Sequence, residues 1–165
     1  MAQNKKEKLF WRKYFGFDDQ QFKNISNKAN RIKLRDTEID DNGLDWLTSK
    51  ITSINQLDLD NTDITDSGIE FLMRLKYLRE LRLKGCFGLT NECLKAINQF
   101  NSLEQLHLGH TQITIEDISQ SITNQNLKLI LLSSSLNESE IQRQVEKLKT
   151  YLPNCVINVN YIEYN

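Results

Sequence analysis

The strongest constraint on this chain of 165 residues is an apolar pattern, L-x-x-L-x-L, that occurs five times. The copies begin at positions 29, 54, 78, 103 and 127, so they are evenly spaced, and a partial sixth copy follows at Ile157 and Val159. Self-similarity at a fixed period of this size indicates a repeat protein, in which each copy is one supersecondary unit. The five triplets are Ala29, Ile32, Leu34; Ile54, Leu57, Leu59; Leu78, Leu81, Leu83; Leu103, Leu106, Leu108; and Leu127, Ile130, Leu132.

Within each unit the apolar spacing changes from that of a strand to that of a helix. A small or polar residue follows the triplet, and then a polar helix-start residue, as at Asp40 or Thr65. Apolar residues three or four positions apart come next, and Pro153 ends the last of these helices. Each unit is therefore predicted to be a strand, a turn and a helix, and stacking buries the apolar face that a single unit leaves exposed. The small or polar positions are Thr37, Thr62, Cys86, Thr111 and Ser135.

These units resemble leucine-rich repeats. The stretches 57–69 and 83–90 are similar to the cysteine-containing subclass of that family, in which Cys86 takes the turn position that Thr62 takes one unit earlier. The resemblance implies an α/β fold: a solenoid of about five strand–turn–helix units, with a parallel concave sheet and convex helices. It is specific for the fold and not for one activity, because members of such families bind unrelated partners.

A chain of this length forms one domain, which we divide into a cap, the repeats and a tail. Because an open stack of repeats exposes apolar core at its ends, residues 1–28 are predicted to be an N-terminal helical cap. The repeats occupy 29–160 and the tail 161–165. The units are expected near 29–53, 54–77, 78–102, 103–126 and 127–153, with a partial edge strand at 154–160.

The N-terminal segment also permits a second interpretation. Residues 1–35 carry ten Lys or Arg against three acids, whereas residues 36–165 carry 11 bases against 19 acids, so the net charge of −1 hides a strong polarity. A cap would bury Leu9, Phe10, Tyr14 and Phe17 on one helix face. In the alternative, the lysines and arginines of the segment, together with Trp11 and Phe15, bind a membrane surface or a nucleic acid.

No catalytic or metal-binding constellation is expected. The two histidines, His107 and His110, lie in one unit but not on one strand face, and no further ligands stand at metal-site spacing. Cys86 occupies a regular turn position, which favours a structural role over a nucleophilic one. The loop around Asp63 lacks the glycine and the bidentate acid of a calcium-binding EF-hand loop. We therefore predict neither an enzyme nor a bound cofactor.

The remaining expectations concern the compartment. The three cysteines show no repeated spacing, so a disulfide framework is not expected and a reducing, cytoplasmic location is predicted. A membrane span is not expected either, because the chain has no run of 18 apolar residues, and no secretory signal is visible after Met1.

The predicted binding surface follows from strand alternation. When Ile32 and Leu34 point into the core, their neighbours face outward on the concave sheet, and the same holds in every unit. The resulting rows change from basic through acidic and mixed to apolar. Exposed leucines at 129 and 131 either mark a contact or are covered by the C-terminal tail. The candidate partner-binding residues are Arg31, Lys33, Arg35, Asp58, Asp60, Glu80, Arg82, Lys84, His107, Leu129 and Leu131.

We therefore expect a non-catalytic protein-binding module that uses this face, such as an inhibitor, an immunity protein that neutralises a toxin, or an adaptor. A protein partner is expected and a nucleic acid is not. The alternative is a peripheral membrane-associated assembly factor held by the basic aromatic N-terminus. Replacing Arg82 and Asp58 with opposite charges is expected to weaken binding and to leave the thermal transition nearly unchanged.

Overall fold

A computed structural model of the chain, described here for residues 2–165, shows an α/β protein built on one seven-stranded sheet. The strands follow one another across the sheet in sequence order, and all neighbours are parallel except the last two, which are antiparallel. The strands are β1 (Lys28–Lys33), β2 (Ser53–Asp58), β3 (Tyr77–Arg82), β4 (Gln105–His107), β5 (Leu129–Leu132), β6 (Val156–Val159) and β7 (Ile162–Tyr164).

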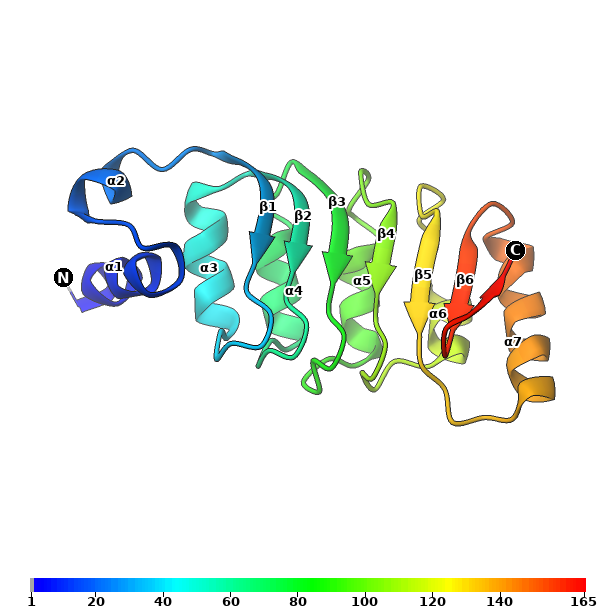
Figure 1. Cartoon of the computed structure of the whole chain (residues 1–165). Coiled ribbons are helices and arrows are strands. Elements are labelled where there is room, and N and C mark those ends of the chain that lie inside the picture. Colours follow the sequence, from blue (N-terminus) through cyan, green and yellow to red (C-terminus); the bar gives the residue numbers. More distant parts are fainter. Residues whose placement is uncertain (1) are drawn as a thin grey trace.

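Helices alternate with the strands, and those between β1 and β6 lie together on one side of the sheet, behind the strands in Figure 1. Each connects two parallel strands, which cannot be joined by a tight hairpin. Two more helices precede β1. The helices are α1 (Ala2–Phe15), α2 (Asp19–Lys23), α3 (Asp41–Lys50), α4 (Asp66–Leu72), η1 (Asn91–Cys93), α5 (Leu94–Ile97), α6 (Ile115–Ser121) and α7 (Glu138–Tyr151).

The strand register reproduces the sequence period. Ile32 pairs with Leu57, Leu57 with Leu81, Leu81 with Leu106, and the same line continues through Ile130 to Ile157. Residues one period apart therefore lie side by side, and all six side chains in this line are buried between the sheet and the helices. The core is thus a set of aliphatic rows, each of which packs against the equivalent row of the next strand.

The helix starts also follow the period. Asp40, Thr65, Thr90, Thr114 and Asn137 are the N-cap residues, at the helix-start positions that the sequence indicates. Two of these starts are held by the preceding unit. The carboxylate of Asp41 accepts hydrogen bonds from the backbone N–H (2.9 Å) and the hydroxyl (2.6 Å) of Thr65, and Asp66 does the same for Thr90. Each cap therefore also fixes the stacking of one unit on the next.

The two ends of the sheet differ. At the N-terminal end, α1 and α2 lie beside α3, and Trp11 and Phe10 are buried against the core. At the C-terminal end, a tight turn at Asn160 and Tyr161 reverses the chain, so that β7 pairs with the outer edge of β6 (Figure 1). Both turn residues have positive φ, which is the geometry of a two-residue hairpin.

Candidate binding surface

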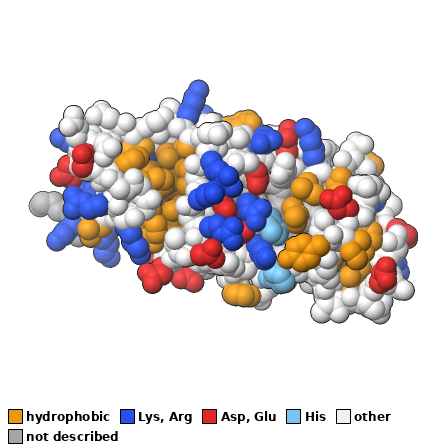
Figure 2. All heavy atoms as spheres, in the orientation of Figure 1, with side chains coloured by type: hydrophobic (Ala, Val, Ile, Leu, Met, Phe, Trp, Pro, Cys, Tyr) orange, Lys and Arg blue, Asp and Glu red, His pale blue; other side chains and the backbone are white. Residues whose placement is uncertain are grey.

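The side of the sheet that faces away from the helices is called the open face, and it is the side seen in Figures 1 and 2. The predicted candidates come from five strands or from the residues just after them, and the register brings them together. Lys33, Asp58, Arg82, His107 and Leu131 are successive pairing partners, so they form one line across the strands. Candidates that are far apart in the sequence therefore share one surface.

The open face is basic over its first three strands. Arg31, Lys33 and Arg35 are exposed on or just after β1, and Lys84 is half-buried just after β3. Figure 2 shows Lys and Arg side chains gathered in this part of the face. Only Arg35 of these four lies within 4.0 Å of a carboxylate of the described residues, with its Nε 3.0 Å from Asp36. The basic end of the predicted gradient is therefore present.

The predicted acidic row is not presented to solvent. Asp58 is 3% exposed and Asp60 is fully buried, because the side chain of Arg82 lies over both. Arg82 Nη2 donates to Asp60 Oδ2 at 2.6 Å, and its Nε lies 3.7 Å from Asp58 Oδ1. The other oxygen of Asp60 accepts from the backbone N–H of Lys84 at 2.9 Å. The expectation that charge reversal here would leave stability unchanged is therefore corrected, since a buried and paired carboxylate is costly to disrupt.

The remaining acid of the predicted rows is engaged as well. Glu80 is half-buried and accepts a hydrogen bond of 2.6 Å from the side-chain amide of Gln56 on the neighbouring strand. With Asp58 and Asp60 under Arg82, the outward charge of this part of the face comes mainly from lysine and arginine. The sequence places both signs in the rows, and the structure buries Asp58 and Asp60 beneath Arg82 while Glu80 stays half-buried.

His107 forms the boundary between the charged and the apolar parts of the open face. Its ring lies over Gly109, where an added Cβ would come within 3.1 Å of Nε2, so the missing side chain makes room for the imidazole. Burial lowers the pKa of His107, and its Nδ1 is buried without a hydrogen-bond partner in the part of the chain that the structure describes. His110 is exposed in the following turn, with φ of 56°, so the two histidines do not form one site.

The apolar end of the open face lies beyond His107. Leu129 and Leu131 are half-buried on β5, and the C-terminal tail pairs with β6 instead of β5. The tail also adds apolar surface, because Tyr161 is 84% and Ile162 is 53% exposed at the hairpin. Figure 2 shows hydrophobic side chains beside the pale blue histidines on this part of the face. Neither tail residue was among the predicted site residues.

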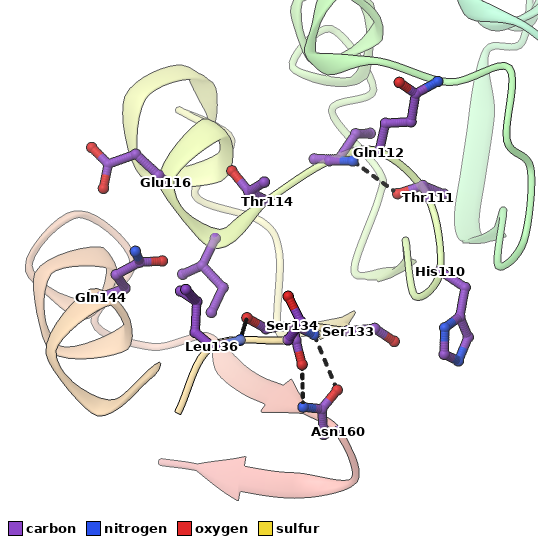
Figure 3. A pocket seen from close by; sticks show the side chains of 13 residues that line it. His110, Thr111, Gln112, Thr114, Glu116, Ser133, Ser134, Leu136, Gln144 and Asn160 are labelled. Carbon is purple, nitrogen blue, oxygen red and sulfur yellow. Dashed lines mark hydrogen bonds between the residues drawn. The ribbon is translucent and has the colours of Figure 1, made fainter. Parts of the chain in front are cut away.

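A polar hollow of about 640 Å³ opens at the turn edge of the sheet, between the loops that follow β4 and β5 (Figure 3). Asn160 closes one side, where its side chain accepts from the N–H of Ser134 at 3.1 Å and donates to the Ser134 carbonyl at 2.7 Å. The hollow lies where the fifth unit has a shorter turn. The turns of the first four units each contain a residue with positive φ, namely Asp36, Asn61, Gly85 and His110. The turn of the fifth unit contains none. Eight of its thirteen lining residues carry a hydroxyl or side-chain amide that can supply hydrogen bonds, and Ile113, Ile115 and Leu136 add apolar surface.

The cysteines have structural positions. Cys86 is buried at the turn position, and its thiol donates to the Leu59 carbonyl of the preceding unit at 3.1 Å, while Thr62 uses its hydroxyl to bond the same oxygen. Burial raises the pKa of Cys86, and it raises the pKa of Cys93 to about 12 and that of Cys155 to about 11. These thiols stay protonated at neutral pH, and a protonated thiol is a poor nucleophile and metal ligand.

The N-terminal segment, whose first residue Met1 lies outside the described part, is helical and packs Phe10, Tyr14 and Phe17 against the core, and it differs from the cap prediction at Leu9. Trp11, which the membrane hypothesis requires at the surface, is fully buried, and its ring lies 4.7 Å from that of Phe15. Leu9, which the cap prediction buries, is 53% exposed. The helix is thus rotated so that Phe10 and Trp11 face the core, with Tyr14, Phe15 and Phe17 packed against them. Its exposed bases are Lys5, Lys6, Arg12 and Lys13.

Within residues 2–165, no helix is both long enough and apolar enough to cross a membrane. The same residues contain no group of three or more His, Cys, Asp or Glu side chains that could hold a metal ion. Comparison of the chain with known protein families and with curated proteins gave no match to either.

Proposed function

We propose that this protein is a leucine-rich-repeat solenoid, similar to the cysteine-containing subclass, that binds another protein without catalysing a reaction. The regular spacing of the residues that pair across five strands supports the repeat. The turn contacts of Thr62 and Cys86 to one carbonyl support the subclass. In this proposal the open face is the concave surface, α1 and α2 are the N-terminal cap, and the residues from Ala29 to Asn160 are the repeats.

The observation that carries the binding function is the open face itself. Six parallel strands present outward side chains there, and the helices between the strands lie on the opposite side (Figure 1). The exposed bases of β1 and the half-exposed leucines of β5 are not explained by the packing of the core. Extended faces of this kind are the binding surfaces of repeat proteins. A standalone module of this type would act as an inhibitor, an immunity protein or an adaptor.

The proposed compartment is the cytoplasm. All three cysteines are unpaired and buried, which fits a reducing environment. The membrane alternative is less well supported, because Trp11, one of its two aromatic residues, lies in the core and is not available to insert into lipid.

Affinity capture from the cells that produce the protein tests the binding function. The bait would be the full chain, compared with the double variant Arg31→Glu and Lys33→Glu on the open face. A matched control is Lys95→Glu with Arg143→Glu, two exposed residues of α5 and α7 that give the same change in net charge. We expect a partner that both the wild-type chain and the control retain and that the open-face variant loses. Equal recovery with all three baits would refute binding through this face.

A further inference from the structure

We infer that the protein bound by the open face presents a short acidic segment followed by an apolar anchor. This inference rests on the proposed function and specifies the chemistry of the partner. It is drawn from three properties of the face: outward bases without a carboxylate partner, two acids paired with Arg82 in its floor, and an apolar end beyond His107.

On the open face, exposed bases lie above two buried aspartates. Asp58 and Asp60 are covered by Arg82, so their carboxylates are already paired within the protein. Among the described residues, no carboxylate lies within 4.0 Å of Arg31, Lys33 or Lys84. These cations are therefore available to a partner, whereas Asp58 and Asp60 are not. Glu80 stays a half-buried acid of the face, bonded to the neutral amide of Gln56.

The net charge is distributed unevenly along the chain. Residues 36–165 carry a net charge of −8, from 11 bases and 19 acids, whereas residues 1–35 carry +7. Three of the ten bases, Arg31, Lys33 and Arg35, lie on the open face, and six of the others lie in α1 or α2. A cationic end on a molecule whose remainder is acidic steers an anionic partner toward that end. Such complementarity determines orientation and association rate more than it determines affinity. The apolar end of the face is then needed for a long-lived complex.

The register gives the spacing between the two parts. Lys33, Arg82, His107 and Leu131 lie on one line across β1, β3, β4 and β5. Neighbouring strands are about 4.8 Å apart, so Lys33 and Leu131 are separated by about 19 Å. An extended chain spans about 3.3 Å per residue, so about six residues of a partner cover this distance. The acids should lie at one end of such a segment and the apolar side chain near the other.

The apolar end favours a protein over a nucleic acid. The apolar groups on and near β5 are the half-buried Leu129 and Leu131, with the exposed Tyr161 and Ile162 at the hairpin. Non-specific binding of single-stranded nucleic acid uses aromatic platforms along a continuous basic groove. Along the line from Lys33 to Leu131 the last cation is Arg82, and the exposed Lys128 before β5 is paired with Glu104. A segment that changes from acidic to apolar therefore matches this line.

Selection of displayed random dodecapeptides on the immobilised full chain tests the inference. We expect enrichment of peptides that carry two or more Asp or Glu and, about six residues away, a Leu, Phe or Trp. The best peptide is then synthesised and titrated by fluorescence anisotropy, together with a version in which Gln replaces its acids. A single-stranded oligothymidylate is titrated in parallel.

The expected pattern is specific to the face. The open-face variant Arg31→Glu with Lys33→Glu should bind the peptide at least about tenfold more weakly, because like charges then meet, and Leu131→Ser should weaken it similarly. The Lys95→Glu and Arg143→Glu control should bind as the wild type does. Raising the salt from about 50 to 500 mM should weaken binding to the wild-type chain, a measurement that requires no variant to fold.

Enrichment of basic or neutral peptides, or of none, would overturn the inference, as would tighter binding of the oligothymidylate than of the acidic peptide. These outcomes are distinguishable from failure of the proposed function. If capture from cells still depends on the open face, the face binds a protein of another chemistry. If capture does not depend on it, the binding function itself fails.

Discussion

The contact between Arg82 and Asp60 gives the sharpest test of the structure, because the sequence pattern places both residues on the surface. Asp60→Ala removes two hydrogen bonds to a charged acceptor, at 2.6 Å from Arg82 and at 2.9 Å from the N–H of Lys84. Each such bond contributes about 1.5–3 kcal/mol. Arg82 is 30% exposed and regains water when its partner is lost, so the smaller value applies to it. We expect a loss of about 3 kcal/mol in unfolding free energy, or a fall of about 6–12 °C in Tm.

Urea denaturation of Asp60→Ala, of Arg82→Ala and of the double variant measures this effect as a cycle. Arg82→Ala should also destabilise the protein, because Asp58 and Asp60 then lose their shared cation. The two losses should fall short of additivity by about 1–3 kcal/mol. Lys33→Ala, an exposed residue in the same register line, is the control and should change stability by less than about 0.5 kcal/mol. A loss below about 0.5 kcal/mol for Asp60→Ala, or additive single changes, would refute the buried pair.

Four further predictions concern other parts of the molecule. Trp11→Ala should cost about 3–5 kcal/mol in urea denaturation, since the ring is fully buried in the cap; a change below about 1 kcal/mol would contradict that burial. Gly85→Ala should destabilise by more than about 1 kcal/mol, because Gly85 has φ of +70° and an added Cβ would collide with Asn61. Burial lowers the pKa of His107, so the unfolded chain binds more protons below pH ~6.5 and stability should fall there with falling pH; thermal scans of His107→Asn should lose this slope. Cys93 and Cys155, with pKa values of about 12 and about 11, should resist iodoacetamide at pH ~8 until urea unfolds the chain, and rapid labelling of the native protein would refute their burial.

Much of the fold was predictable because the constraint on each unit is local and is repeated. A strand that packs between two equivalent strands must bury its aliphatic side chains, as Leu81 does between Leu57 and Leu106. An atypical residue in one unit does not hide the apolar pattern, because the other units repeat it. The helix starts were predictable for a similar reason, because Thr65 and Thr90 combine a strong capping residue with a fixed place in the period.

The exposure and pairing of the side chains on the open face were only partly predictable. Alternation determines on which side of the strand Asp58 lies, but not that Arg82 from the next strand covers it. That outcome depends on side-chain length and on pairing with the neighbouring unit, and the periodic pattern contains neither. The rotation of α1 was missed because Phe10, Trp11, Tyr14 and Phe15 offer apolar residues to more than one helix face.

The edge strand at 154–160 was predicted and is β6, but the returning strand β7 of the C-terminal hairpin was missed because it is only three residues long. Asn160 carried a usable signal, since asparagine adopts positive φ more readily than most residues and marks two-residue turns. The following residue, Tyr161, is an unusual choice for such a turn, and that concealed it. The polar hollow beside Asn160 depends on the shortened fifth turn, which the sequence indicates only as a missing residue.

The reversed last strand has a consequence for assembly. A parallel stack of equivalent strands has no intrinsic end, because the exposed edge of β6 could accept β1 of another molecule and so begin a head-to-tail filament. β7 occupies that edge in the opposite direction and leaves only a short new edge. At the other end, the lysines and arginines of β1 oppose the approach of a second basic strand. The two edges of the sheet are thus closed by different features, a reversed strand at one end and a row of bases at the other.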